Sequence, residues 1–241
     1  ATFFVLGWTA DRHPAVVQEI LARGHEVGCH SFRHPVIYEM TREEFRADCE
    51  QALEILTRCG AHEVKGFRAP SFSITPPVHD YLEVLQDLGF GYDSSIFPVR
   101  HPRYGQPASP RQPFRLGDDP QGLIEVPLPT WRFLGQNVPY SGGGYLRLLP
   151  WPAFKTLRGL ARRQGVPCIT YLHPWELDDF KPRVGLDAAT TVRSTGGQDS
   201  MPVKLEKILA GGTFLTMGEY VDRLRKDYAS LPVRVRPGTA A

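Results

Sequence analysis

Residues 1–35 read ATFFVLGWTADRHPAVVQEILARGHEVGCHSFRHP and contain one complete β-α-β unit. The run Thr2–Leu6 predicts a buried strand, because no charged residue interrupts it. Pro14 suits the first position of a helix and Gly24 suits its end. Glu26–Cys29 predicts a second, short strand. The helix between them has an apolar stripe formed by Val16, Val17, Ile20 and Leu21.

The alternation of strands and helices continues along the chain. Thr41 and Glu44 form the pattern of a capping box and predict a helix that ends at Gly60. This order predicts an α/β fold with a mostly parallel sheet, open or closed into a barrel, whose site lies at the carboxyl ends of the strands. Further strands are expected over residues 64–67, 91–96, 123–128 and 168–172, helices over 76–88 and 151–163, and a final helix–strand–helix after residue 200.

The composition is that of a folded globular protein. The 241 residues are 41% hydrophobic and 22% charged, which excludes disordered, collagenous and coiled-coil proteins. The net charge of +2 gives no reason to expect a nucleic-acid partner. The longest apolar runs are far shorter than the ~18 residues of a membrane span, so we expect no transmembrane segment in this chain.

Prolines and cysteines carry two further expectations. Pro98–Pro120 includes six prolines, which remove backbone donors, so we expect a surface loop there. The four cysteines contain no CxxC pair and are expected to be buried thiols. This favours reducing surroundings and a cytoplasmic location.

The first cluster of chemistry-bearing residues is His30-Ser31-Phe32-Arg33-His34-Pro35, directly after the second strand. An HxxxH spacing places two imidazoles on one side of a helical turn and suits a zinc-like ion. Two histidines are a weak signal by themselves. The alternative is that one ring bonds backbone carbonyls and the other is exposed. A catalytic zinc needs at least one further protein ligand.

Two more clusters follow other strands. The second cluster is Gly66-Phe67-Arg68-Ala69-Pro70-Ser71, in which Arg68 would place a guanidinium at the carboxyl end of a strand. There it could orient a carboxylate. The alternative is a surface ion pair, which is more common for an arginine at a strand end. Tyr171-Leu172-His173-Pro174-Trp175-Glu176 offers His173 as a general acid and Trp175 as a face for a sugar ring. The alternative for His173 is a core histidine held by a backbone carbonyl.

Together these clusters resemble the polysaccharide deacetylases of the NodB-homology type, which are carbohydrate esterases with a deformed (β/α)7-type barrel. The likeness runs from Thr2–Phe4 through His30–Pro35 and Arg68–Pro70 to Leu172-His173. Residues 92–98, 142–145 and 173–176 resemble the subgroup associated with exosortase-linked exopolysaccharide gene clusters. The resemblance implies one deacetylase domain over residues 1–241, with a barrel core over 1–175 and an extension over 176–241 that packs on it.

The resemblance also implies an activity, the metal-dependent removal of N-acetyl groups from a polysaccharide or oligosaccharide in exopolysaccharide biosynthesis. His30 and His34 would bind a divalent metal, taken as zinc, which would polarise the amide carbonyl and activate a water. Arg68 would orient an aspartate that acts as base. The backbone N–H of Ser71 would help to hold the oxyanion, although this serine stands where the family motif more usually has tyrosine.

The remaining implied roles belong to the second half of the chain. His173 would protonate the leaving amine, and Trp131 and Trp175 would form walls for the sugar, with packing in the core as the alternative for both tryptophans at about even odds.

The chain departs from the family pattern at its beginning. In the family the first strand ends in an Asp-Asp pair, which supplies the base and the third metal ligand and precedes the segment that matches Thr2–Phe4. Asp118-Asp119 and Asp178-Asp179 stand elsewhere and do not fit. We therefore expect a barrel that is truncated at its N-terminus, and weak or no activity from these 241 residues alone.

Two other functions remain open. The first is a non-catalytic glycan-binding barrel in which both histidines are structural. The second is an amidase acting on a small cyclic amide, since a fold does not fix a function. The long proline-rich loop and the tryptophans modestly favour an extended sugar substrate over a small one.

Overall fold

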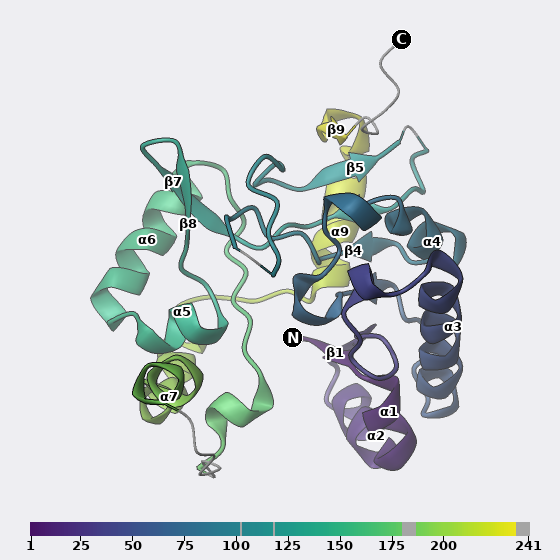
Figure 1. Ribbon diagram of the computed structural model, residues 1–241, viewed down its shortest axis with the longest axis horizontal. Helices are drawn as coiled ribbons and strands as arrows, with labels where there is room; N and C mark the ends of the chain where they lie inside the picture. The colour runs from purple at the N-terminus through teal and green to yellow at the C-terminus, as the bar shows by residue number, and fades with distance from the viewer. Residues whose placement is uncertain (102, 118, 180–186, 235–241) are drawn as a thin grey trace. The chain divides into compact units, whose positions relative to one another are not determined.

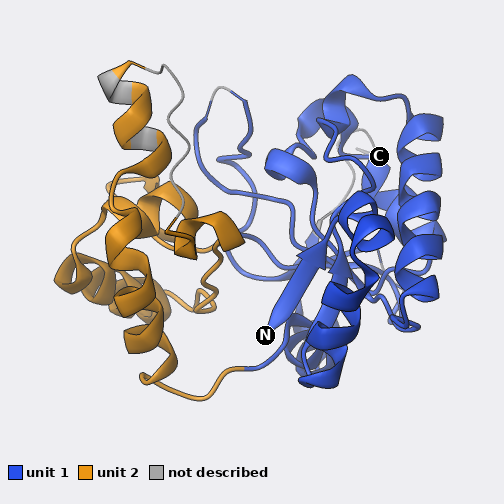
Figure 2. Cartoon of the chain, turned by 90° about the horizontal axis from the view of Figure 1, so that it is seen from below, with its two compact units in different colours: residues 1–128, 215–241 blue, residues 129–214 orange. Residues whose placement is uncertain are grey.

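The computed structural model describes residues 1–101, 103–117, 119–179 and 187–234. The chain divides into two compact units, which Figure 2 shows in different colours. Unit 1 comprises residues 1–128 and 215–241, and unit 2 comprises residues 129–214. Each unit has its own cluster of buried apolar side chains. That residues 1–175 form one barrel core stays a prediction.

Unit 1 is an α/β unit with one seven-stranded sheet (Figure 1), in the order β1-β2-β3-β4-β6-β5-β9. The first five strands in this order are parallel, and β5 runs antiparallel to β6. The described strands end at β1 on one side and β9 on the other, so closure into a barrel is not shown. The elements are β1 (Thr2–Val5), α1 (Gly7–Arg12), α2 (Pro14–Ala22), β2 (Glu26–Cys29), η1 (Ile37–Glu39), α3 (Arg42–Arg58), β3 (Gly66–Phe67), η2 (Pro70–Phe72), η3 (Pro76–Val78), α4 (Tyr81–Asp87), β4 (Tyr92–Asp93), β5 (Phe114–Leu116), β6 (Ile124–Glu125), α9 (Met217–Arg225), η6 (Tyr228–Ser230) and β9 (Val233–Arg234), where η marks a 3₁₀ helix.

The five parallel strands share one register. Val5 pairs with Cys29, Cys29 with Phe67, Phe67 with Asp93, and Asp93 with Glu125. These five residues therefore form one row across the sheet. In parallel strands the residues that follow a row form the next row, with side chains on the opposite face.

Helix α3 covers the sheet as the capping box predicted. The Thr41 hydroxyl accepts from the Glu44 N–H, and the Glu44 carboxylate accepts from the Thr41 N–H. The helix buries an apolar stripe that includes Phe45, whose ring packs edge-on against Phe67 of β3 at 5.6 Å between centroids. The remaining buried residues of α3 are Cys49, Ala52, Ile55 and Leu56.

Unit 2 contains a two-stranded hairpin and a group of helices around a smaller core. Leu134 and Gly135 have φ of 46° and 78°, which is the left-handed conformation that a two-residue hairpin turn requires. This hairpin was not predicted, because Leu134 is unusual at such a position. The elements are β7 (Thr130–Phe133), β8 (Gln136–Pro139), α5 (Gly143–Leu148), α6 (Trp151–Arg163), η4 (Pro174–Leu177), α7 (Ala188–Thr195), η5 (Gln198–Ser200) and α8 (Met201–Leu209).

Several predicted elements differ in the structure. The strand predicted over residues 168–172 is wrong: the carbonyls of Ile169 and Tyr171 accept from Ser141 Oγ and the Gly143 N–H, so this segment joins no strand ladder. The predicted helix over 76–88 is split into η3 and α4, after a pair of prolines that lack backbone donors. The final elements run helix–helix–strand, and the proline-rich loop contains β5. Three cysteines are buried as expected, but Cys168 is exposed.

Gly66 shows why β3 tolerates no side chain at its first residue. A Cβ on Gly66 would lie 2.1 Å from Cζ of Tyr92, whose hydroxyl donates to Glu26 Oε1 at 2.8 Å. The Glu26 carboxylate also accepts from the Thr2 hydroxyl and the Gly218 N–H. The absent side chain at residue 66 thus lets one buried tyrosine reach a carboxylate that joins β1, β2 and α9.

A second buried feature is the pair Asp93 and Glu125, neighbours in the register row and each 0% exposed. Ser95 Oγ donates to Asp93 at 2.5 Å, and the Ile96 N–H donates to Glu125 at 3.0 Å. Burial, followed by the charge of Asp93, raises the pKa of Glu125 well above its usual range. Burial raises the pKa of Asp93 as well. The folded chain therefore keeps a proton here that an exposed pair would release.

We expect Gly66→Ala to destabilise the protein by about 1–3 kcal/mol, because the added methyl group overlaps the Tyr92 ring. Urea unfolding followed by circular dichroism measures this loss. Gly159→Ala is the control: nothing lies within 4 Å of a Cβ at that helical position, so the variant should be neutral or more stable. Equal stability of the two variants would contradict the packing argument.

The buried carboxyl pair predicts that stability falls as pH rises. The unfolded chain releases the Glu125 proton near the ordinary value of 4.5, whereas the folded chain releases it only at higher pH. The free energy of unfolding should therefore decline between these two pKa values. Glu125→Gln should flatten the decline, because a neutral amide replaces the protonated carboxyl. Urea titrations from about pH 5 to about pH 8 test this, with Glu54→Gln, on the exposed face of α3, as the control.

Candidate functional site

Three polar side chains follow the register row of unit 1. The His30 N–H donates to the Val5 carbonyl, the Arg68 N–H to the Cys29 carbonyl, and the Ser94 N–H to the Phe67 carbonyl, each at 3.0 Å. His30, Arg68 and Ser94 thus occupy the next row, at the carboxyl ends of β2, β3 and β4. Because side chains alternate along a strand, all three project to the same face of the sheet. The structure therefore places His30 and Arg68 side by side at the carboxyl ends of β2 and β3.

The segment from His30 to His34 is not a helical turn, so that part of the prediction is wrong. Ser31 and His34 have φ of 66° and 63°, which breaks a helical path. The Ser31 hydroxyl accepts from the His34 N–H at 3.0 Å, and Asp48 of α3 accepts from the Phe32 N–H at 2.8 Å. The loop nevertheless places the two imidazoles side by side, with ring centroids 5.1 Å apart and planes at 78°.

The His30 ring has the arrangement that metal-binding histidines show. Its Nδ1 lies 2.7 Å from the Arg68 carbonyl oxygen, which can only accept, so Nδ1 carries the proton. This selects the tautomer whose lone pair is on Nε2, the state of the ring that binds a metal. His30 and His34 thus fit two positions of a metal site. Within the described ranges no group of three histidine, cysteine, aspartate or glutamate side chains could hold an ion.

Arg68 is buried rather than held in the surface ion pair that we considered. Its Nε donates to the Ser94 carbonyl at 3.0 Å and its Nη2 to the Ser94 hydroxyl at 2.8 Å. The guanidinium lies over the Phe4 ring, 4.4 Å from the centroid. Ser94 lies within residues 92–98, and its hydrogen bonds to Arg68 were not predicted. The strand predicted over residues 91–96 includes Ser94, whereas β4 ends at Asp93, so no sequence signal marked this serine.

Ser71 lies in a strained turn at the end of the Arg68 segment. Ser71 and Phe72 both have φ of 53°, a conformation that costs non-glycine residues about 1–3 kcal/mol. Two hydrogen bonds hold the turn: Ser95 Oγ accepts from the Ala69 N–H at 2.7 Å, and Ser73 Oγ donates to the Pro70 carbonyl at 2.6 Å. Such strain is retained when the surrounding structure fixes it, and it often marks a functional site.

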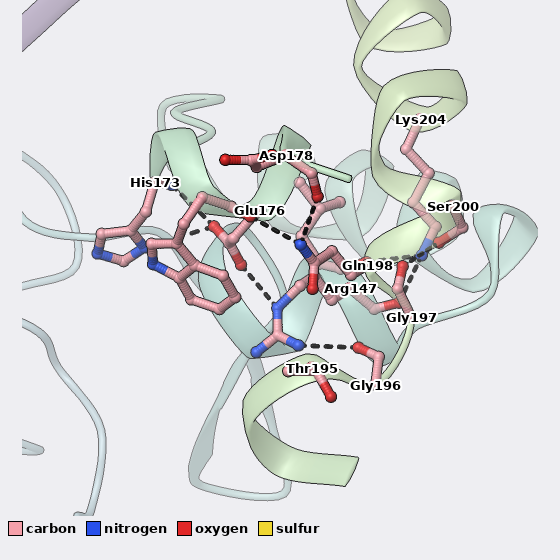
Figure 3. A network of polar contacts seen from close by, with 12 residues as sticks. Arg147, His173, Glu176, Asp178, Thr195, Gly196, Gly197, Gln198, Ser200 and Lys204 are labelled. Carbon is pink, nitrogen blue, oxygen red and sulfur yellow. Dashed lines mark hydrogen bonds and ion pairs between the residues drawn. The ribbon is translucent and has the colours of Figure 1, made fainter. Parts of the chain in front are cut away.

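His173 belongs to unit 2, at the start of η4. Its backbone N–H donates to Glu176 Oε2 at 2.8 Å, and its Nδ1 lies 3.4 Å from the same oxygen. Arg147 of α5 donates from Nε to Glu176 Oε1 at 2.7 Å (Figure 3). The His173 side chain is 51% exposed, whereas Glu176 is 0% exposed. His173 is therefore not the core histidine that we weighed as an alternative.

The charge of Glu176 is stabilised although the group is buried. Burial raises its pKa, but hydrogen bonds from His173, the charge of His173 and the hydrogen bond from Arg147 outweigh that effect, so the pKa is lowered. Glu176 and Arg147 were not predicted as site residues. The spacing of three between His173 and Glu176 is the signal that was available, since it is the spacing of a capping box.

The two tryptophans differ in their surroundings. Trp175 is 44% exposed and stacks on His173, with ring centroids 6.0 Å apart and planes at 22°. The Arg147 guanidinium lies 5.1 Å from the Trp175 ring centroid. Trp131 is partly buried against the core of unit 2 and stacks on Phe133 at 4.8 Å. Trp175 thus offers a surface beside His173, and Trp131 also contributes to packing.

Two protein families match the chain in succession. The polysaccharide deacetylase family matches residues 1–92, which include His30, His34, Arg68 and Ser71. A domain of unknown function, DUF3473, matches residues 94–222, which include His173. Among the helices of the described ranges, none has both the length and the apolar character that a membrane crossing requires.

The curated relatives are similar over about a third of the chain. A peptidoglycan-N-acetylglucosamine deacetylase of Bacillus cereus is 36% identical over 83 residues, which is 34% of this chain and 28% of that protein. Chitin deacetylase 1 of Saccharomyces cerevisiae is 36% identical over 69 residues, 29% of this chain and 23% of that protein. A chitooligosaccharide deacetylase of Azorhizobium caulinodans is 35% identical over 71 residues, 29% of this chain and 34% of that protein. The matched segment thus spans about a quarter to a third of each relative.

One solved structure resembles nearly the whole chain. It is a protein of Mycobacterium smegmatis assigned to the polysaccharide deacetylases, with a TM-score of 0.63 over 98% of this chain and 76% of that chain. At 22% sequence identity this likeness shows the fold. Residues 1–92 of the chain thus match the polysaccharide deacetylase family, and through residues 94–222 the chain belongs to the DUF3473 domain family.

Proposed function

We propose that the protein hydrolyses the amide bond of N-acetyl groups on a polysaccharide or oligosaccharide, with the help of a divalent metal. The observation that carries this proposal is the pair His30 and His34, whose rings lie side by side while the Arg68 carbonyl fixes the His30 tautomer. Both histidines lie within the segment that the polysaccharide deacetylase family matches. The relatives whose names state a substrate are deacetylases of peptidoglycan, chitin and chitooligosaccharides.

His30 and His34 would supply two ligands to the metal, which we take to be zinc. When bound, such an ion polarises a carbonyl group and lowers the pKa of a water molecule. The family pattern assigns the third ligand and the catalytic base to an Asp-Asp pair, and no such pair stands at the matching place in these 241 residues. A complete site therefore needs carboxylates beyond the two histidines.

The roles of the other residues follow from their chemistry. Arg68 has its guanidinium fixed by Ser94 and can orient a carboxylate that acts as base. The strained turn holds Ser71, whose N–H would stabilise the negative charge that develops on the acetyl oxygen. His173 would give a proton to the leaving amine. Trp131 and Trp175 would contact sugar rings.

We further propose that the substrate is an exopolysaccharide, and that the sheet of unit 1 belongs to a (β/α)7-type barrel. The support is the likeness of residues 92–98, 142–145 and 173–176 to the exosortase-linked subgroup. The parallel pairing of β1 to β4 and β6 supports the barrel, because strands of this kind of barrel run parallel.

The experiment is an assay of acetate release by the protein expressed from its complete coding sequence. Chitooligosaccharide, purified exopolysaccharide and a cyclic ureide are compared, each with zinc and after treatment with a chelator. We expect acetate from the acetylated saccharides, lost with the chelator and restored by zinc. Saccharide binding that ignores the chelator, without any acetate, would instead indicate a glycan-binding protein. Turnover of the cyclic ureide alone would indicate an amidase.

Zinc binding by the 241-residue chain gives a separate prediction. His30→Ala and His34→Ala should each weaken zinc binding by at least about tenfold, because each removes one of the two paired imidazoles. Competition with a chromophoric chelator measures the affinity. His62→Ala, at an exposed position of the same unit, should leave it unchanged. Equal zinc affinity in the wild type and all three variants would show that His30 and His34 do not bind the metal.

A further inference from the structure

We propose that Glu176 is a positioning residue for His173, which turns the His173 ring so that Nδ1–H faces the carboxylate and Nε2 faces the substrate. This inference rests on the proposed function for its catalytic meaning. Its structural part, the tautomer and orientation of one ring, can be measured without any activity. Figure 3 shows the residues that form the arrangement, all of them in unit 2.

The two oxygens of Glu176 have different tasks. Oε2 accepts from the His173 backbone N–H at 2.8 Å and faces the ring Nδ1 at 3.4 Å. Oε1 accepts from Arg147 Nε at 2.7 Å. Since a carboxylate can only accept, the nitrogen that faces it is expected to carry a proton. The backbone contact fixes Glu176 beside the start of η4, so the carboxylate cannot follow the ring if the ring turns.

Arg147 holds the carboxylate in place and, together with the hydrogen bonds from His173, keeps it charged. The Arg147 and Glu176 side chains are 3% and 0% exposed, and Arg147 Nη1 also donates to the Gly196 carbonyl at 2.8 Å. A buried carboxylate without a partner would take up a proton instead, whereas this one has a lowered pKa. Arg147 itself lies in α5, which Lys204 of α8 holds through the carbonyls of Leu146, Arg147 and Leu149.

The surroundings of the His173 ring are aromatic. Trp175 stacks on it at 6.0 Å, and Tyr171 meets it edge-on at 6.3 Å. Glu176 and Arg147 are the charged groups on η4 and α5 that the described contacts place in this network. The Glu176 carboxylate therefore fixes Nδ1 as the ring nitrogen that faces it. The Trp175 and Tyr171 rings restrict how far the imidazole can tilt.

This geometry suits a general acid. The protonated ring carries a hydrogen on each nitrogen, and Nε2–H gives its proton to the amine nitrogen while the C–N bond of the amide carbon breaks and its electron pair goes to that nitrogen. The ring is then neutral, with Nδ1–H still directed at Glu176. A carboxylate at this position stabilises the protonated ring before the transfer and preserves the orientation after it.

Replacement of Glu176 by glutamine should invert the tautomer. An amide has one accepting oxygen, for which the buried Arg147 Nε–H and the His173 backbone N–H compete. A charged donor makes the stronger hydrogen bond, so the oxygen stays with Arg147 and the amide NH₂ turns toward His173. Nδ1 must then accept, and the proton moves to Nε2. The double variant Arg147→Met/Glu176→Gln frees the amide oxygen to accept from His173, so it should restore the original tautomer. This variant replaces a buried ion pair with uncharged side chains, a change that proteins often tolerate.

The experiment is a long-range ¹⁵N–¹H correlation spectrum of the ¹⁵N-histidine-labelled chain, at a pH where the rings are neutral, with His173→Gln used to assign the signal. We expect Nδ1–H in the wild type, Nε2–H in Glu176→Gln, and Nδ1–H again in the double variant. Gln164→Ala is the matched control, since it removes the hydrogen bonds of Gln164 with the Arg132 backbone in the same unit without touching His173, Glu176 or Arg147. Nε2–H in the wild type would overturn the proposal, whether or not any variant folds.

Kinetics of the active protein complete the test. Glu176→Gln should lower kcat by about tenfold or more, part of the ~10²–10⁴-fold that acid–base catalysis contributes, and should leave KM unchanged. The inverted tautomer with an unchanged kcat would overturn the positioning role. If no substrate releases acetate from the wild type, the proposed function fails, while the tautomer measurement still decides whether Glu176 orients the ring.

Discussion

Hydrogen bonds between parallel strands place Cys29, Phe67 and Asp93 in one row of the sheet, and most of unit 1 depends on that alignment. The residues that follow the row, His30 and Arg68 among them, must then share one face. A shift of one residue in any strand would turn its polar side chain to the other face of the sheet. The register of the parallel strands therefore fixes which residues lie side by side at this edge of the sheet.

The loop after β2 shows how local strain serves the same end. A helical turn would have been the cheaper backbone for five residues, yet Ser31 and His34 adopt positive φ. The contacts of Asp48 with the Phe32 N–H and of the Ser31 hydroxyl with the His34 N–H offset that cost. Burial raises the pKa of Asp48, and the N–H groups of Phe32 and Arg33 lower it in turn. The anchoring of the loop thus involves a partly desolvated carboxylate on α3.

Unit 2 has no large sheet, so its site residue His173 is held in a different way. A half-exposed histidine on a short 3₁₀ helix has few neighbours to hold it, and the structure supplies a buried ion pair for this purpose. Buried ion pairs contribute little net stability, because desolvation of both charges offsets their attraction. This ion pair contributes orientation: Arg147 holds one oxygen of Glu176 while the other oxygen faces His173.

The sequence by itself determined the β-α-β order, the capped helix α3 and the positions of His30 and Arg68 directly after β2 and β3, because periodicity and capping are local properties. Tertiary structure decided the rest. The hairpin contacts Gln164, the loop that ends at His34 contacts Asp48, and residues 169–171 contact Ser141 and Gly143. The hydrogen bonds between Arg68 and Ser94 and the ion pair between Arg147 and Glu176 join segments that are separate in the sequence. A local sequence pattern therefore could not predict them.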